Sequence, residues 1–289
     1  MITVGVLALQ GGFSEHLGSL RKAAAHISTS SSLTSTSTPT PTFDFLEVRT
    51  PGQLARCDAL VIPGGESTTL SLVAAQSGLL EPLREFVKIN KKPTWGTCAG
   101  LILLSEQASA TKRGGQELIG GLDVKVHRNH FGRQIESFVT DLNLPFLSQA
   151  GAGNQVAPFP AVFIRAPVVD QVLADDVETI DHNSEFTTPD IAEPISGNEV
   201  NRVSKRKVEV LATLPGRHAS NEAAAIAATK TMAMATSTLK GDDQAAVSPK
   251  GAGDIVALRQ GNVFGTSFHP ELTDDIRIHA WWLGQISRS

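Results

Sequence analysis

Cysteine and long apolar runs are both scarce in this chain of 289 residues. Its two cysteines, Cys57 and Cys98, are too few for a disulfide framework and lack the spacing of a zinc site. No apolar run reaches the ~20 residues that cross a bilayer. The start "MITVGVLALQGG" is too short and too uncharged for a signal peptide. We therefore expect a cytoplasmic protein without a membrane partner.

Basic residues are also too few to indicate a nucleic-acid partner. The chain has 25 Lys and Arg against 29 Asp and Glu, a net charge of −4, and no long basic block. Hydrophobic residues make up 41% and charged residues 19%, which is typical of a globular protein with a sizeable core. The composition thus favours a globular protein that does not bind nucleic acid.

Strand-like and helix-like segments alternate in the first third of the chain. Apolar, β-branched runs that end in turn residues predict strands in "ITVGVLALQGG", "FDFLEVRT", "CDALVIPGG" and "PTWG". Helical spacing occurs in "FSEHLGSLRKAAAH" and in "STTLSLVAAQSGLLEPLREFVKINKK", the second with a break near Gly78. This alternation predicts an α/β fold with three layers, a mostly parallel sheet flanked by helices.

The rest of the chain combines further strands with stretches that cannot build a core. Strands are expected in "LDVKVHRNHFGRQIESFVTDL", "AVFIRAPVVD", "KVEVLATLP" and "DIVALRQGNVFGTSFHPEL", and a final helix in "DDIRIHAWWLGQI". Residues 28–42 are all Ser, Thr or Pro except Leu33, and 182–206 and 217–250 are irregular in pattern. We expect a single domain over residues 1–289 with disordered or irregular surface insertions at these three places.

Cys98 lies in the sequence Gly96-Thr97-Cys98-Ala99-Gly100, between a predicted strand and the helix predicted from "AGLILLSEQ". This is the form of a nucleophile elbow with cysteine in place of serine. Small neighbours allow the tight, strained turn that exposes the sulfur at the edge of the sheet. The alternative is a buried cysteine that acts as a small hydrophobic residue, the commoner fate of a lone cysteine.

A cysteine nucleophile needs a base and a group that orients the base. In "FGTSFHPELTDD", His269 ends an apolar run and Glu271 lies two residues further on. Residues i and i+2 of an extended segment point to the same side, and Pro270 stiffens the link. Taken alone, this is more often a strand end with a solvated acid. Together with the elbow cysteine, it predicts a Cys98-His269-Glu271 triad.

The pair "GTCAG" and "SFHPE" resembles the class I glutamine amidotransferases, which have a Cys-His-Glu triad and a flavodoxin-like three-layer fold. A longer series of blocks resembles one family among them, the glutaminase subunits of pyridoxal 5′-phosphate synthase. These blocks occur in order along nearly the whole chain: "VGVLALQGGFSEH", "VIPGGESTTL", "EPLREF", "GTCAGLILL", "RNHFGRQIESF", "FIRAP" and "GTSFHPELTDD".

The resemblance implies a role for each matched residue. Cys98 would be the nucleophile, His269 the general base and then acid, and Glu271 the residue that orients His269. The backbone N–H groups of Gly65 and Ala99 would form the oxyanion hole. The glutamine pocket would be lined by Gly65, Glu66, Ser67, Arg128, Ile164 and Arg165.

The pocket residues also have plainer interpretations. Arg128 has the setting of a solvated strand residue, and Glu66 that of an acid at a helix N-terminus. Arg165 is less easily explained in this way, because a charge within the apolar run "AVFIRAP" needs a partner. Cys57 is expected to be structural, and His16, His127 and His130 receive no role.

The implied activity is hydrolysis of L-glutamine to glutamate and ammonia through a cysteine thioester, with no metal or cofactor. The ammonia would pass through a channel to a synthase subunit in a hetero-oligomeric complex that makes pyridoxal 5′-phosphate. The segment "ALQGGFSEH" is expected to take part in docking. One alternative is the glutaminase subunit of another amidotransferase, against which "RNHFGRQIESF" and "LALQGG" argue. The other is a silent regulatory or binding protein of the same fold, against which the intact triad argues.

Overall fold

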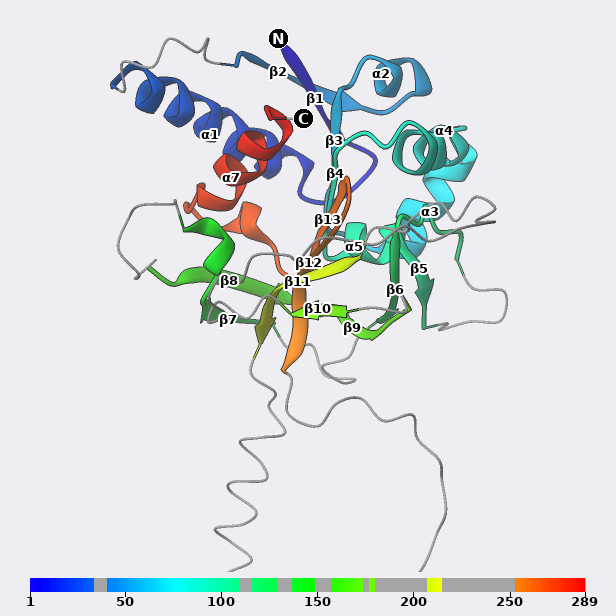
Figure 1. Ribbon diagram of the computed structural model, residues 1–289. Coiled ribbons are helices and arrows are strands. Elements are labelled where there is room, and N and C mark those ends of the chain that lie inside the picture. Colours follow the sequence, from blue (N-terminus) through cyan, green and yellow to red (C-terminus); the bar gives the residue numbers. More distant parts are fainter. Residues whose placement is uncertain are drawn as a thin grey trace, which may run out of the picture.

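The computed structural model of this chain forms a large mixed sheet with helices on both faces, and a separate small sheet (Figure 1). The described residues are 1–33, 41–109, 116–128, 137–148, 157–173, 177–179, 207–214 and 253–288. Among them the main sheet has 11 strands in the order β2-β1-β3-β4-β13-β12-β9-β6-β5, with β11 beside β12 and β10 beside β11. The three-layer α/β architecture expected from the sequence is confirmed.

One half of the main sheet is parallel. It consists of β2 (Phe43–Val48), β1 (Ile2–Leu7), β3 (Ala59–Ile62), β4 (Thr94–Thr97) and β13 (Val263–Thr266). All residues of β3, β4 and β13 are buried, as their continuous apolar runs require for strands covered on both faces. Parallel strands place their carboxyl ends at one edge, so the loops after β1, β3, β4 and β13 meet there.

The other half is largely antiparallel, which the sequence did not predict. It contains β12 (Asp254–Gln260), β9 (Val168–Val172), β6 (Leu122–His127), β5 (Ser105–Ala108), β11 (Val208–Leu214) and β10 (Val177–Thr179). The cause at β12 and β13 is the two-residue turn at Gly261 and Asn262, with Gly261 at φ 59°, because so short a turn joins only antiparallel strands. The small sheet pairs β7 (Ser137–Leu142) with β8 (Phe159–Ile164).

The helices cover the two faces of the main sheet unequally (Figure 1). On one face lie α1 (Phe13–Leu33) and α7 (Arg277–Ile286). On the other lie α3 (Ser67–Gln76), α4 (Leu80–Arg84), the π-helical turn η1 (Glu85–Ile89) and α5 (Ala99–Leu104). The described residues also contain the short elements α2 (Pro51–Ala55), η2 (Pro145–Leu147) and η3 (Pro270–Leu272). The predicted helix break at Gly78 is confirmed, because this residue has φ 70°.

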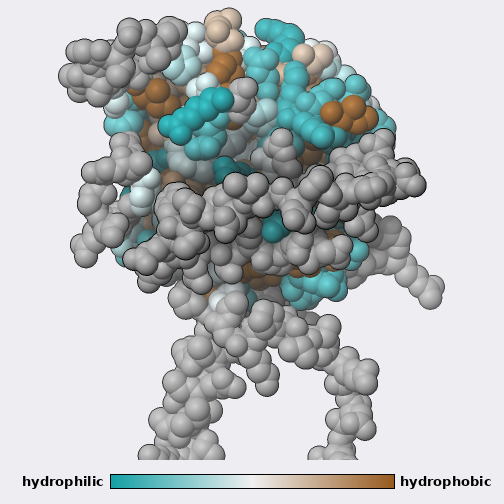
Figure 2. Space-filling model, in the orientation of Figure 1, coloured by the Kyte–Doolittle hydropathy of each residue, from teal (hydrophilic) through white to brown (hydrophobic). Residues whose placement is uncertain are grey.

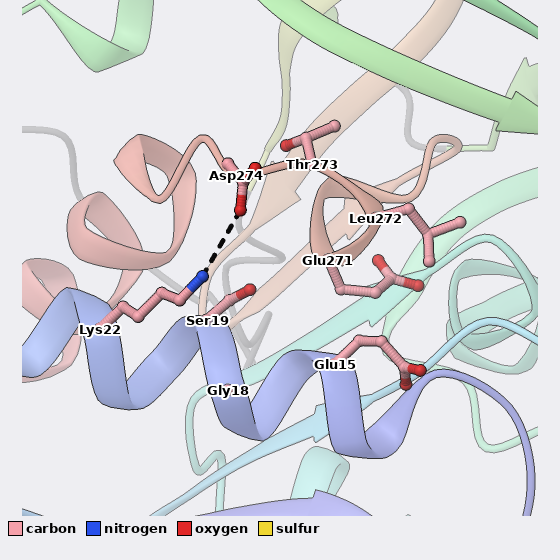
Figure 3. Close-up of a pocket in the computed structure, with 8 residues that line it drawn as sticks. All are labelled: Glu15, Gly18, Ser19, Lys22, Glu271, Leu272, Thr273 and Asp274. Atoms are coloured by element: carbon pink, nitrogen blue, oxygen red, sulfur yellow. Dashed lines mark hydrogen bonds and ion pairs between the residues drawn. The ribbon is translucent and has the colours of Figure 1, made fainter.

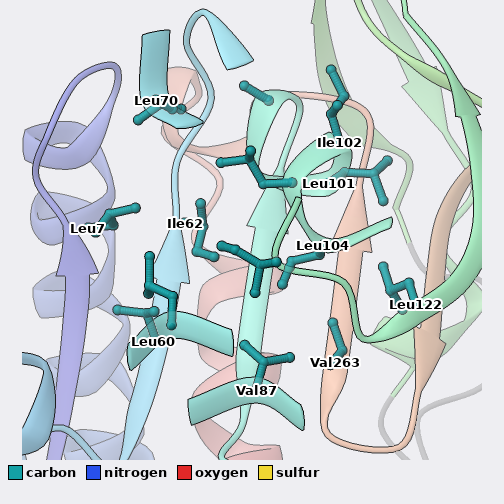
Figure 4. Close-up of a cluster of buried hydrophobic side chains, with 14 of the residues drawn as sticks. Leu7, Leu60, Ile62, Leu70, Val87, Leu101, Ile102, Leu104, Leu122 and Val263 are labelled. Carbon is teal, nitrogen blue, oxygen red and sulfur yellow. The ribbon is translucent and has the colours of Figure 1, made fainter. Parts of the chain in front are cut away.

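Each face has its own apolar core. One packs α3, α4 and α5 onto the sheet through residues such as Leu60, Ile62 and Leu101 (Figure 4). The other packs α1 and α7 onto the opposite face around Trp95, whose ring centroid lies 5.5 Å from Phe264 and 5.7 Å from Trp282. The two cores fix the sheet and therefore the edge at which the loops meet.

The Ser/Thr-rich stretch 28–42 differs in part from the expected irregular insertion, because α1 continues to Leu33. The hydroxyls of Ser28 and Thr29 donate to the carbonyls of Ala24 and Ala25, each at 3.0 Å, so these polar side chains are satisfied within the helix. The remainder at 34–40, and the expected insertions 182–206 and 217–250, lie outside the described residues.

Large exposed hydrophobic side chains belong to separate parts of the chain, namely Met1, Leu72, Ile89, Val139 and Leu272. On the face shown in Figure 2, hydrophobic areas are small and lie among hydrophilic ones. No helix within the described ranges is long and apolar enough to span a membrane.

Candidate active site

Cys98 lies at a sharp turn between β4 and α5. It has φ 49° and ψ −101°, a conformation that non-glycine residues rarely adopt. The turn is tight: a Cβ on Gly100 would overlap the carbonyl of Ile62, and one on Gly96 would lie 2.5 Å from the carbonyl carbon of Gly100. The Cys98 backbone N–H donates to the carbonyl of Thr266 on β13 at 2.8 Å. The chain therefore has the elbow geometry that the glycine spacing predicts.

His269 and Glu271 meet directly beside this turn. His269 Nδ1 lies 2.8 Å from Glu271 Oε1, and the two residues are only 8% and 5% exposed. The backbone differs from the extended segment expected, because the 3₁₀ turn η3 begins at Pro270. The Leu272 N–H donates to the carbonyl of His269 at 3.3 Å. The Glu271 carboxylate is thus buried rather than solvated, and the 3₁₀ turn brings it into direct contact with the His269 ring.

The pKa of His269 is strongly displaced. Burial lowers this pKa, but hydrogen bonds and charge interactions with Cys98 and Glu271 outweigh burial and raise it to about 10. Burial raises the pKa of the Glu271 carboxyl, but the neighbouring His16 and His269 outweigh it, and the pKa is lowered. Both directions favour an imidazolium between a carboxylate and the sulfur, the arrangement that supports a reactive thiolate.

The Gly64–Gly65 loop after β3 covers the cysteine and histidine. A Cβ on Gly64 would overlap His269 Cε1 and lie 3.3 Å from Cys98 Cβ. Gly65 has φ 151°, a value that residues with side chains rarely adopt. Gly64 thus lets the loop backbone lie close to Cys98 and His269, and a backbone oxyanion donor requires such a close approach. The other expected donor, Ala99, follows Cys98 at the start of α5.

The loop after β1 packs against the Gly64–Gly65 loop. A Cβ on Gly11 would overlap the carbonyl oxygen of Gly64. With its carboxamide turned to suit both partners, Gln10 accepts from the Glu66 N–H at 2.6 Å and donates to the Glu66 carbonyl at 3.3 Å. The two loops therefore hold one another in place beside Cys98.

Glu66 and Arg128 form a pair at the N-terminus of α3. The Glu66 carboxylate accepts from the N–H groups of Thr68 and Thr69, at 3.2 and 2.6 Å, so it caps the helix. Burial raises the pKa of Glu66, but these hydrogen bonds outweigh it and lower the pKa. Arg128 lies 3.7 Å from Glu66 Oε1 and donates to Thr68 Oγ1 at 3.0 Å. Its side chain is only 11% exposed, so it is not the solvated residue of the plainer interpretation.

Ser67, Ile164 and Arg165 have different settings. Ser67 is buried, and its hydroxyl donates to Gln116 Oε1 at 3.1 Å. The Ile164 carbonyl lies 3.9 Å from Cys98 Sγ, so the end of β8 borders the nucleophile. Arg165 is exposed with φ 44°, beyond the end of the strand. The expectation of a charge inside a strand run was therefore wrong, because the chain turns before the arginine.

No role was predicted for His16, yet the structure places it beside the predicted triad. His16 is fully buried on α1, and its Nε2 lies 3.3 Å from Glu271 Oε2. The only signal in the sequence is its place on the apolar face of α1, with Leu17, Leu20 and Ala23.

The other residues without a predicted role lie apart from the triad or outside the described ranges. Cys57 is buried, and burial raises its pKa to about 11. His127 is exposed, and His130 lies outside the described residues.

No cluster of His, Cys, Asp and Glu suited to a metal ion occurs within the part of the chain that the structure describes. The site instead offers a strained cysteine, a buried histidine–carboxylate pair and a glycine loop. This set of groups is suited to acyl transfer from an amide or ester.

Comparison with known proteins identifies the family. The model of the SNO glutamine amidotransferase family matches residues 6–213 and 218–288. The chain is 38% identical to the probable pyridoxal 5′-phosphate synthase subunit PDX2 of Arabidopsis thaliana, over 98% of this chain and 85% of that protein. It is 34% identical to the pyridoxal 5′-phosphate synthase subunit PdxT of Herpetosiphon aurantiacus, over 98% of this chain and 100% of the relative. A solved structure of a glutamine amidotransferase superposes with a TM-score of 0.59 at 29% identity, covering 98% of both chains. These matches confirm the resemblance found in the sequence, and the chain belongs to the SNO glutamine amidotransferase family.

Proposed function

We propose that this chain is the glutaminase subunit of a pyridoxal 5′-phosphate synthase, and that it hydrolyses L-glutamine to L-glutamate and ammonia at Cys98. The observation that carries the proposal is the elbow cysteine beside a buried His269–Glu271 pair with a 2.8 Å contact. Membership of a glutamine amidotransferase family and the names of the relatives support the substrate and the pathway.

The proposed reaction has two stages. The Cys98 thiolate attacks the side-chain carbonyl carbon of glutamine, and the backbone N–H groups of Gly65 and Ala99 stabilise the oxyanion. The C–N bond breaks as His269 gives its proton to the departing nitrogen, which leaves as ammonia. A water then gives a proton to His269 and attacks the thioester carbonyl. The C–S bond breaks, which frees glutamate and restores the Cys98 thiolate beside protonated His269. Glu271 binds His269 Nδ1 and so keeps the ring in the orientation in which its other nitrogen faces the sulfur.

The pocket proposed for glutamine uses Glu66, Ser67, Arg128, Ile164 and Arg165. A zwitterionic substrate needs an anion for its ammonium group and a cation for its carboxylate. Arg128 and Glu66, 3.7 Å apart, provide both charges side by side, the arginine largely buried and the carboxylate exposed. We propose that Arg128 binds the α-carboxylate, and that Ile164 and Arg165 form the wall nearest the sulfur.

The ammonia is proposed to pass to a synthase subunit within a hetero-oligomeric complex in the cytoplasm. In water at neutral pH, free ammonia becomes protonated and ceases to be a nucleophile, so a channel between the subunits would preserve it. The segment 8–16 includes Gly11, which abuts the Gly64 carbonyl. Docking on this segment would therefore reach the proposed oxyanion loop directly.

The test is release of glutamate and ammonia from glutamine, with and without the cognate synthase subunit. Wild type is compared with Cys98→Ala, and Cys57→Ala is the matched control because Cys57 is the other cysteine. We expect partner-stimulated release in wild type and Cys57→Ala and none in Cys98→Ala. Absence of release from wild type with the partner present would overturn the proposal and leave a binding protein of this fold. Stimulation by a different synthase alone would reassign the pathway.

A further inference from the structure

The polar contacts at the triad do not end at Glu271. Its Oε1 is used by His269, whereas its Oε2 is buried and has no well-aligned hydrogen bond with any residue in the described ranges. The nearest nitrogen is His16 Nε2, at 3.3 Å. The same nitrogen lies 3.2 Å from Thr97 Oγ1, at the end of the strand that carries Cys98. Glu271 Oε2 and Thr97 Oγ1 are therefore both within reach of the same ring nitrogen.

The hydrogen-bond directions along this network agree with one another. His16 is fully buried, which lowers its pKa, so its ring is neutral and carries one N–H. A carboxylate only accepts, so the proton belongs on Nε2. Nδ1 must then accept, and its partner is His279 Nε2 at 3.1 Å. This leaves His279 Nδ1 as an acceptor, and that buried atom indeed has no hydrogen bond with the described residues.

The position of His16 argues against simple space filling. The ring lies in the apolar core, with its centroid 5.4 Å from Trp95 and 5.3 Å from His279. A leucine of similar size would fill this space without burying a polar ring, and such burial costs free energy unless the hydrogen bonds of the ring are made. The ionisable groups that affect His16 are Glu271, His269, Glu15 and His279. Of these groups, Glu271 is the carboxylate that lies within 3.3 Å of His16 Nε2, so it can accept the N–H of a neutral ring.

The contacts between α1 and η3 point the same way. Figure 3 shows the pocket between these two elements, with Glu271 on η3 beside α1. The pair that spans the outer rim, Lys22 and Asp274, is exposed and 3.5 Å apart, so it contributes little. His16 contacts Glu271 in the buried region, where the dielectric is low and a polar contact is stronger.

We propose that His16 is a positioning residue of the glutaminase site: its Nε2–H holds Glu271 Oε2, so that Oε1 stays aligned with His269. This inference rests on the proposed function. It extends the triad to a chain from His279 through His16 and Glu271 to His269, with contributions from α7, α1 and the loop after β13. His16 acts on the reaction only through Glu271.

Two substitutions test the two ring nitrogens of His16 one at a time. The carboxamide nitrogen of His16→Gln reaches the place of Nε2, whereas that of His16→Asn reaches only the place of Nδ1. We expect His16→Asn to lower kcat about tenfold with KM nearly unchanged, as for loss of one hydrogen bond to a charged group. His16→Gln should retain most of the activity. His26→Gln is the matched control, because His26 is exposed on the same helix.

A second readout does not need glutamine turnover. The rate at which iodoacetamide alkylates Cys98 is followed against pH by peptide mass spectrometry, which separates Cys98 from Cys57. We expect the midpoint in His16→Asn to move up by about one pH unit, because a less well-held Glu271 supports the His269 imidazolium less. If wild type alkylates normally but releases no ammonia with the synthase present, the proposed function fails. The alkylation comparison still decides the role of His16.

A double-mutant cycle distinguishes positioning from general stability. In a Glu271→Gln background, His16→Asn should cause no further shift in alkylation and no further loss of kcat. The inference is overturned if His16→Asn costs the same factor in both backgrounds. It is also overturned if His16→Gln and His16→Asn lose activity equally, in proportion to a fall in Tm, or if neither variant differs from wild type.

Discussion

Cys98 has a backbone conformation that costs free energy, and its neighbouring glycines permit it. A non-glycine residue with φ 49° and ψ −101° is strained by about 1–3 kcal/mol. The strain persists because β3, β4 and α5 pack so closely that Gly100 has no room for a Cβ beside the Ile62 carbonyl. The direction in which the sulfur points is therefore set by the packing of buried elements.

Gly100→Ala should lower both stability and activity. The added methyl group would overlap the Ile62 carbonyl, so we expect the free energy of unfolding to fall by about 1–3 kcal/mol. Partner-stimulated ammonia release should fall further than the loss of folded protein explains. Gly18→Ala is the control, because no atom lies within 4 Å of its Cβ in α1. It should stabilise by up to about 1 kcal/mol. Urea unfolding measures both, and wild-type behaviour of Gly100→Ala would contradict the argument.

The raised pKa of His269 should make stability depend on pH. Its pKa of about 10 in the folded protein lies above the ordinary value of 6.5, so protonation favours the folded state. This contribution is fully present below about pH 6.5 and is lost as the pH rises through about 10. The difference in unfolding free energy between wild type and His269→Gln should shrink over that window. In a Cys98→Ala background the decline should still begin near pH 6.5 but be complete at lower pH, because Cys98 raises the pKa of His269 in the folded protein. A difference that is constant with pH would speak against the assignment.

At the scale of elements, the local sequence pattern predicted the strands that helices cover on both faces of the sheet. The apolar runs of β1, β3 and β4 and the helical spacing of α3 and α4 predicted parallel strands and their covering helices. Pairing across the other half depends on contacts between distant segments, such as Val126 of β6 with Val169 of β9, which no local pattern specifies. Helix α5 ends at Leu104, sooner than "AGLILLSEQ" indicated, because Ser105 already pairs with Leu122 of β6.

Gly78 separates α3 from α4 for a conformational reason. Its φ of 70° is left-handed, and nothing lies within 4 Å of a Cβ placed there, so an added side chain meets strain but no clash. Gly78→Ala should therefore cost about 1–2 kcal/mol of unfolding free energy. Gly78→Asn should cost clearly less, since asparagine tolerates this region better. Urea unfolding of both variants measures the difference. Equal losses would indicate a cause other than backbone conformation.

At the scale of the whole molecule, the candidate site could be predicted only where a short motif carries it. The elbow glycines flank Cys98, and His269 and Glu271 are two residues apart, so these residues were found from the sequence. His16 lies 255 residues before Glu271, and their contact depends on how α1 packs against η3. Arg165 was misjudged for a related reason. The end of β8 depends on its pairing with β7, and that pairing is not visible in "FIRAP".

Three distant segments meet at the proposed oxyanion loop, so a change in one should be felt at the cysteine. Gly11 has φ 82° and abuts the Gly64 carbonyl, and Gly64 in turn abuts His269. Gly11→Ala should push the Gly64–Gly65 backbone out of line and lower kcat by about 10²-fold, the usual cost of losing one oxyanion donor. KM should rise as well, because Gly65 also belongs to the proposed glutamine pocket. Cys98 alkylation should change less than kcat, because none of the three triad side chains is altered. Gly52→Ala, which meets no atom within 4 Å, is the control. A folded Gly11→Ala variant with wild-type kcat in the presence of the synthase would show that the N-terminal loop does not govern the oxyanion donor.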